Sequence, residues 1–165
     1  MITMPLGGIT GGTQTIMGFN YGAGRPDRIR KAEIHIVLLG IVFTTVMFMI
    51  AHLVPQYFVD IFTRDPAYTK VTNWAIRVYT LSIIPLAVQY TVVDGFTGMG
   101  IAKVAVSLSM FRKLVYMIAM FALPAIWGAQ AIFYSEPISD MVSCVTSLST
   151  YLLISGKVLG DGRRY

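Results

Sequence analysis

The sequence predicts an all-α protein, a polytopic transmembrane helix bundle of about five spans. Hydrophobic residues make up 55% of the 165 residues and charged residues only 13%, whereas about a quarter of an average soluble domain is charged. The apolar residues form long runs, and the cations gather in the connections between these runs, as in membrane proteins. The lipid bilayer is therefore the first expected partner.

The charge pattern and the few metal-binding side chains exclude several other classes of protein. The net charge is +5, but the cations form no continuous basic face, so no nucleic-acid partner is expected. Cys144 is the only cysteine and His35 and His52 lie far from each other, so neither a disulfide nor a zinc site is expected. A nucleophilic set of Cys144, Asp140 and a histidine lacks any supporting motif, and we expect neither an enzyme nor a cofactor.

The first predicted span covers residues 2–23 and contains no charged residue. It includes Pro5 and many glycines, which transmembrane helices tolerate because neighbouring helices satisfy freed backbone groups. No basic segment precedes its apolar part, so a cleavable signal peptide is not expected.

The other four predicted spans each have about the 20 residues that a helix needs to cross the hydrocarbon. Prolines end or interrupt some of them, because proline cannot continue a regular helix. These spans are 34–54, which Pro55 ends, 74–93, which Pro85 interrupts, 104–127, and 129–155, which contains Pro137.

Basic residues follow the first, third and fifth spans, whereas the alternate connections are balanced or uncharged. The positive-inside rule therefore places the N-terminus outside and the C-terminus in the cytoplasm of a cell (plasma or inner) membrane. An odd number of spans that begins outside leads us to expect a piece of a longer protein. The basic residues are Arg25, Arg28, Arg30 and Lys31 after the first span, Lys103 after the third, and Lys157, Arg163 and Arg164 after the fifth.

Several motifs resemble those of the multidrug and toxic compound extrusion (MATE) family. The segment from Gly12 to Ala23 resembles the family's glycine- and tyrosine-rich motif before a basic segment, although Thr15 and Phe19 depart from the usual proline and tyrosine. Further similar stretches are Phe62-Thr63-Arg64-Asp65, Arg77-Val78-Tyr79, Gly98-Met99-Gly100, Ser109-Met110-Phe111-Arg112, Trp127-Gly128 and Pro137-Ile138-Ser139-Asp140.

The resemblance implies that residues 1–165 form a partial C-terminal lobe, helices eight to twelve of twelve. It implies multidrug or organic-cation efflux by antiport, with Na⁺ or H⁺ as the coupling ion, small amphipathic or cationic substrates, and a missing N-terminal lobe as partner. Two alternatives stay open: a truncated remnant that does not transport, and a related transporter that flips lipid-linked saccharides.

Three polar residues of the first span are candidates for the transport pathway. Gln14 and Tyr21 are seven residues apart and share a helix face, and an amide with a phenol can contact an amphipathic cation. For Asn20 and Tyr21 we favour packing at the helix end, since glycines flank them. For Gln14 both roles stay open.

Asp94 and Arg112 are the charged candidates for the pathway. Asp94 ends an uncharged run, and a carboxylate partly out of water could bind and release a coupling cation. We expect instead that it lies at the cytoplasmic interface and pairs with Lys103 or Arg112. Arg112 is expected to extend to the interface, and Glu136 and Asp140, four residues apart, to cap the last helix at the outer surface.

Overall fold

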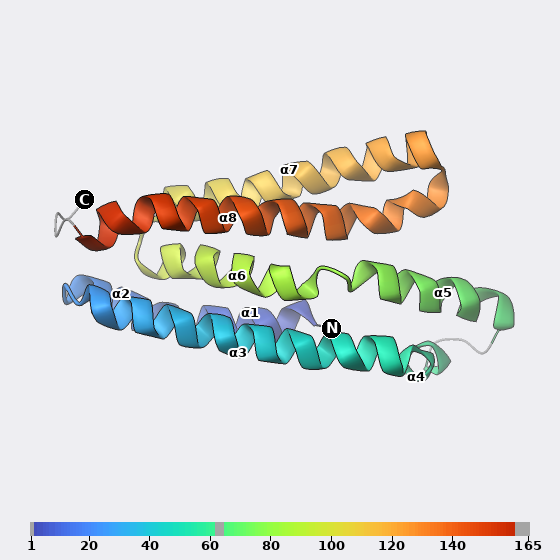
Figure 1. Ribbon diagram of the computed structural model, residues 1–165, viewed down its shortest axis with the longest axis horizontal. Helices are drawn as coiled ribbons and strands as arrows, with labels where there is room; N and C mark the ends of the chain where they lie inside the picture. The colour runs from blue at the N-terminus through green and yellow to red at the C-terminus, as the bar shows by residue number, and fades with distance from the viewer. Residues whose placement is uncertain (1, 62–64, 161–165) are drawn as a thin grey trace.

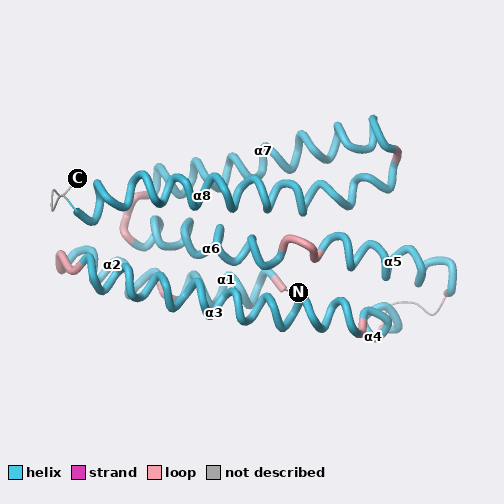
Figure 2. Tube along the Cα trace, in the orientation of Figure 1, coloured by secondary structure: helices cyan, strands magenta, loops and turns pink. Residues whose placement is uncertain are grey.

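A computed structural model describes residues 2–61 and 65–160, and this part of the chain is helical without a strand, which confirms the all-α prediction (Figure 2). The described elements are α1 (Thr3–Gly12), α2 (Gln14–Gly22), α3 (Pro26–Leu53), α4 (Pro55–Asp60), α5 (Pro66–Tyr79), α6 (Ile83–Gly98), α7 (Ala102–Trp127), the 3₁₀ helix η1 (Ala129–Tyr134) and α8 (Ser135–Gly160).

Helix α6 occupies the centre of the bundle. It contacts α1, α2 and α3 on one side and α7 and α8 on the other, and Figure 1 shows it lying lengthwise between these two groups. Its buried side chains include Leu86, Ala87, Val92 and Phe96. Gly40 on α3 brings that helix close, because a methyl group added there would lie 3.4 Å from the Cβ of Ala87.

The described helices make this a multi-pass membrane protein. Three of them are long and apolar enough to cross a bilayer: Pro26–Leu53, Ala102–Trp127 and Ala129–Gly156. The pair Tyr68–Tyr79 and Ile83–Gly98, bent by 46°, gives a fourth if it forms one span. Many large apolar side chains on these helices are exposed, including Leu38, Val42, Val106, Phe121 and Leu153, as lipid contact requires.

The first predicted span consists of two helices, because α1 ends at Gly12 and α2 begins at Gln14. Gly11 and Gly12 weaken the helix at this point, since glycine is a poor helix former. The Thr13 hydroxyl donates a hydrogen bond of 2.6 Å to the carbonyl of Thr10, and such local bonds compete with helical ones. The helix is therefore interrupted next to Gln14.

The third predicted span bends before Pro85 rather than at it. Helix α5 ends at Tyr79 and α6 begins at Ile83, so Pro85 lies in the first turn of α6. A proline ring clashes with the carbonyl four residues earlier but is tolerated in a first helical turn. The bend therefore lies on the N-terminal side of the proline.

Two of the connections between helices lie at one end of the bundle. In Figure 1 the α2–α3 and α6–α7 turns lie at the end where α8 finishes, whereas α4 and the α7–η1 junction lie at the other. Gly24 (φ 63°) and Gly100 (φ 77°) close these two turns. The amide of Arg25 donates to Asn20 and that of Ile101 to Phe96, which is the Schellman pattern of helix termination.

Helix α3 begins at Pro26, eight residues before the predicted start of the second span, so Arg28, Arg30 and Lys31 lie on its first turns. Pro55 ends α3 as predicted. The orientation of the termini remains a prediction. Phe62, Thr63 and Arg64 of the sequence motif and the basic residues Arg163 and Arg164 lie outside the described residues.

Candidate cation site

Two glycines bring α2 and α6 into backbone contact. A methyl group added at Gly98 would lie 2.6 Å from the backbone oxygen of Gln14, and one added at Gly18 would lie 2.6 Å from the backbone oxygen of Gly98. Small residues allow this close approach of helices in membranes. The contact positions Gln14, at the start of α2, beside the last turns of α6.

Asp94 on α6 accepts hydrogen bonds from both sides of the α1–α2 break. The Gln14 amide nitrogen donates to Oδ1 at 2.9 Å, and the Thr10 hydroxyl donates to Oδ2. Thr10 is buried, and Gln14 and Asp94 are half-buried. The structure thus joins Gln14 and Asp94, two of the predicted pathway residues, in one cluster with Thr10.

The negative charge of Asp94 has no cationic partner in this cluster, because both donors are neutral. Arg112 forms its ion pairs with Glu136 and Asp140, and the described side chains of Lys103 and Asp94 form no ion pair with each other. The expected pairing of Asp94 with Lys103 or Arg112 is therefore wrong. That expectation relied on nearness along the chain, whereas the rotation of α6 turns Asp94 toward α1 and α2.

Asn20 and Tyr21 do not join Asp94. The Asn20 amide donates to the carbonyl of Ile16 in its own helix at 2.8 Å, and its backbone carbonyl closes the Gly24 turn. Tyr21 packs against the apolar cluster that contains Met17 and Ile29. These contacts favour the packing role for both residues.

Arg112 forms a second polar cluster between α7 and α8. Its Nε donates to Asp140 at 2.9 Å and its Nη2 to Glu136 at 2.7 Å, and the side chain is only 12% exposed. Ser82 donates to the other carboxylate oxygen of Asp140 at 3.0 Å. Arg112 is thus buried and paired rather than extended to the interface. Glu136 lies in the first turn of α8, as expected, but both it and Asp140 pair with Arg112.

Thr10 and Ser82 were not predicted from the sequence. Thr10 precedes Gln14 by four residues, and this spacing places both on one helix face. The spacing could therefore have identified Thr10 as a neighbour of Gln14. Ser82 gave no such signal, because it lies in the bend between α5 and α6 and reaches Asp140, 58 residues later.

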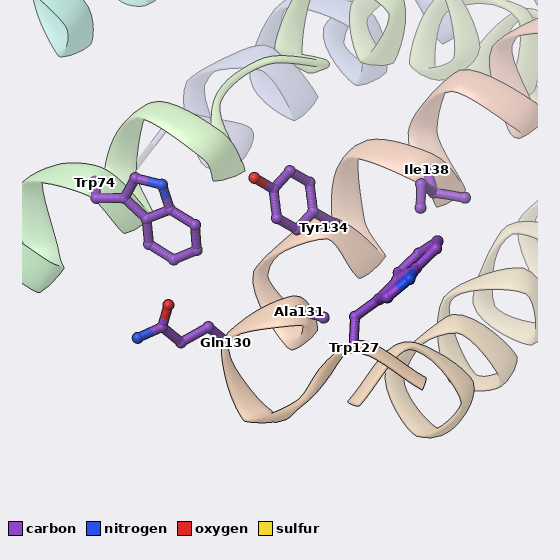
Figure 3. Close-up of a pocket in the computed structure, with 6 residues that line it drawn as sticks. All are labelled: Trp74, Trp127, Gln130, Ala131, Tyr134 and Ile138. Atoms are coloured by element: carbon purple, nitrogen blue, oxygen red, sulfur yellow. The ribbon is translucent and has the colours of Figure 1, made fainter. Parts of the chain in front are cut away.

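An aromatic cavity of about 400 Å³ lies at the opposite end of the bundle from the Gly24 and Gly100 turns. Figure 3 shows the Trp74, Tyr134 and Trp127 rings around it. Trp74 and Tyr134 meet edge to face, with ring centroids 6.1 Å apart. Tryptophan and tyrosine are enriched where helices leave the bilayer, which suits this position. The other lining residues are Gln130, Ala131 and Ile138.

Comparison with known families agrees with the motifs and the fold. Residues 1–121 match the family model MatE, which is more than half of the chain. No curated protein and no solved structure matches the chain. The match confirms the resemblance found in the sequence, and the chain belongs to the MatE family of membrane transporters.

Proposed function

We propose that this chain takes part in multidrug or organic-cation efflux, driven by antiport of Na⁺ or H⁺, together with the N-terminal lobe that the family resemblance implies. The observation that carries the proposal is Asp94, a half-buried carboxylate whose hydrogen-bond donors, Thr10 and Gln14, are both neutral. Ionisable groups inside membrane bundles commonly mark ion and substrate pathways.

The chemistry of this cluster suits exchange of one cation for another. A carboxylate without a fixed counter-charge attracts an organic cation, a sodium ion or a proton, and it holds only one of them at a time. Antiport requires that the substrate and the coupling ion cannot occupy the site at the same time. The interrupted first span also fits, because transporter sites commonly form beside broken helices.

Gln14 supplies the polar contact that orients the carboxylate. Its side-chain amide nitrogen donates to Oδ1 of Asp94. Its side-chain oxygen remains available to accept a hydrogen bond from a substrate or to coordinate sodium. Thr10 holds the other oxygen. The site therefore presents one charge and several neutral oxygens.

Binding of ethidium, a fluorescent organic cation, tests the proposal. The purified chain in lipid nanodiscs should raise ethidium anisotropy, and Asp94→Asn should weaken binding about tenfold or more, which corresponds to about 1.4 kcal/mol. Replacing potassium chloride in the buffer by sodium chloride should displace ethidium from the unsubstituted chain, and so should lowering the pH. Asp27→Asn, at an exposed acid on α3, is the matched control. Equal ethidium affinity in the Asp94 and Asp27 variants would contradict the proposal.

A further inference from the structure

Glu33 is a buried acid that the cation site does not use. It lies on α3 in the stripe of buried residues that also contains Ile29 and Ile36, and it is 5% exposed. Neither carboxylate oxygen has a hydrogen-bond partner. An ionised carboxylate in such a site would lose its hydration without compensation, and the usual outcome is that the group stays neutral.

The surroundings of Glu33 are largely apolar. One carboxylate oxygen lies against Gly95 of α6, where an added methyl group would be 3.3 Å from it and 3.5 Å from the methyl group of Met17 on α2. Because Gly95 has no side chain, there is room beside it for the carboxyl group of Glu33. Gly95 and Met17 supply no side-chain oxygen for a metal ion, and the phenol of Tyr151 supplies only one, so the site suits a proton rather than sodium.

The titratable and charged groups near Glu33 do not neutralise it. Tyr151 of α8 is the phenol that faces it, although the carboxylate oxygens form no hydrogen bond in this arrangement. Arg30, one turn earlier on α3, is exposed. Asp94, next to Gly95 on α6, is engaged by Thr10 and Gln14.

We infer that Glu33 is a proton-binding site separate from Asp94, located where α3 packs against α2 and α6 and where Tyr151 of α8 faces it. It holds a proton while these helices are in contact. When α3 separates from α6, water reaches the carboxyl group, the O–H bond breaks and the proton passes to water, leaving a carboxylate. Glu33 lies one turn from the exposed Arg30, at the end of the bundle where the α2–α3 turn and the basic residues Arg28, Arg30 and Lys31 lie. The proton therefore leaves toward this basic end.

Infrared spectroscopy of the purified chain in lipid bilayers tests this inference directly. At about neutral pH the unsubstituted chain should show the carbonyl stretch of a protonated carboxyl group, and the part due to Glu33 should be absent in Glu33→Gln but present in Asp27→Asn. An unchanged spectrum in Glu33→Gln would overturn the inference. Asp94→Asn should retain the Glu33 band. If this band is present but Asp94→Asn leaves ethidium affinity unchanged, the proposed function alone fails.

Thermal unfolding provides a second, independent readout. An ordinary glutamate ionises near pH 4.3 when exposed, so raising the pH from about 5 to about 8 should favour open states of the unsubstituted chain and lower its melting temperature. This loss should be smaller in Glu33→Gln and in Glu33→Met, which are neutral at both pH values. Identical pH dependence in all three chains would overturn the inference. Failure of both variants to fold would also overturn it, because a neutral carboxyl group is replaceable by a neutral side chain.

Discussion

The side-chain amide of Gln14 donates a hydrogen bond of 2.9 Å to the carboxylate of Asp94, although 80 residues separate them in the sequence. The bond joins the start of α2 to the last turns of α6, at the point where the two backbones approach through Gly18 and Gly98. The close contact of α2 with α6 therefore holds Gln14 and Asp94 of the candidate cation site together.

The Gln14–Asp94 bond should contribute measurably to stability. Hydrogen bonds between membrane helices average about 0.6 kcal/mol and reach about 1.7 kcal/mol, and a charged acceptor favours the upper end. A double-mutant cycle of Gln14→Ala and Asp94→Ala, read by thermal unfolding in detergent, should give a coupling energy of about 1 kcal/mol. Gln130→Ala, at an exposed glutamine, should show no coupling to Asp94→Ala. Additive effects of the Gln14 and Asp94 substitutions would contradict the bond.

Gly98→Ala should separate α2 from α6. The added methyl group would lie 2.6 Å from the backbone oxygen of Gln14 and 2.9 Å from its Cα, and backbone atoms cannot move aside as a side chain can. Overpacking of this kind costs about 1–3 kcal/mol, so the melting temperature should fall. Ethidium binding should weaken as well, because Gln14 moves away from Asp94.

Gly12→Ala is the matched control for the packing prediction, because nothing lies within 4 Å of a methyl group added there. Alanine is a better helix former than glycine, so this variant should melt at the same temperature as the unsubstituted chain or slightly higher. Equal melting temperatures for the Gly12 and Gly98 variants would show that the two helices do not approach as closely as described.

Arg112→Met should destabilise the bundle strongly. It leaves Glu136 and Asp140 near each other with no counter-charge, and removal of one partner from a buried ion pair costs about 3–5 kcal/mol. Thermal unfolding in detergent should show the loss, which should become smaller in acid as the carboxylates gain protons. Adding Glu136→Gln and Asp140→Asn should restore much of the stability, because no unpaired charge then remains.

Lys113→Met removes an exposed neighbouring cation and should change the melting temperature little. A loss in this variant equal to that in Arg112→Met would mean that overall charge, rather than the Arg112 cluster, determines the effect.

The predicted topology can be checked by labelling single cysteines. In a Cys144→Ser background, Gln130→Cys puts the label on η1 and Arg28→Cys puts it on the first turn of α3. Figure 1 shows η1 and the start of α3 at opposite ends of the bundle, and both positions are exposed. A maleimide that cannot cross membranes should label Gln130→Cys in intact cells, and Arg28→Cys only after permeabilisation. The reverse pattern would place the basic end outside and overturn the positive-inside assignment.

Local properties of the sequence determined the helical class, the approximate limits of the helices and the basic connections. Helix α7, Ala102–Trp127, begins two residues before the predicted span 104–127, and Pro55 ends α3 as expected. Hydropathy, glycine content and the missing backbone N–H of proline act over a few residues, so their effects can be predicted without a tertiary structure. The sequence also predicted an interruption at Pro85 itself, but the ring of this proline excludes the preceding helical turn, so the bend lies between Tyr79 and Ile83.

The tertiary structure alone decided which polar groups meet. Sequence nearness suggested Lys103 or Arg112 for Asp94, but Asp94 bonds to Thr10 and Gln14. Glu33 was not singled out at all, since it lies between the basic residues and the predicted start of the second span at residue 34. Only the helix start at Pro26 places it in a buried stripe. Such contacts depend on how each helix is rotated and how closely it packs, and these are set by distant segments rather than by the residues beside each group.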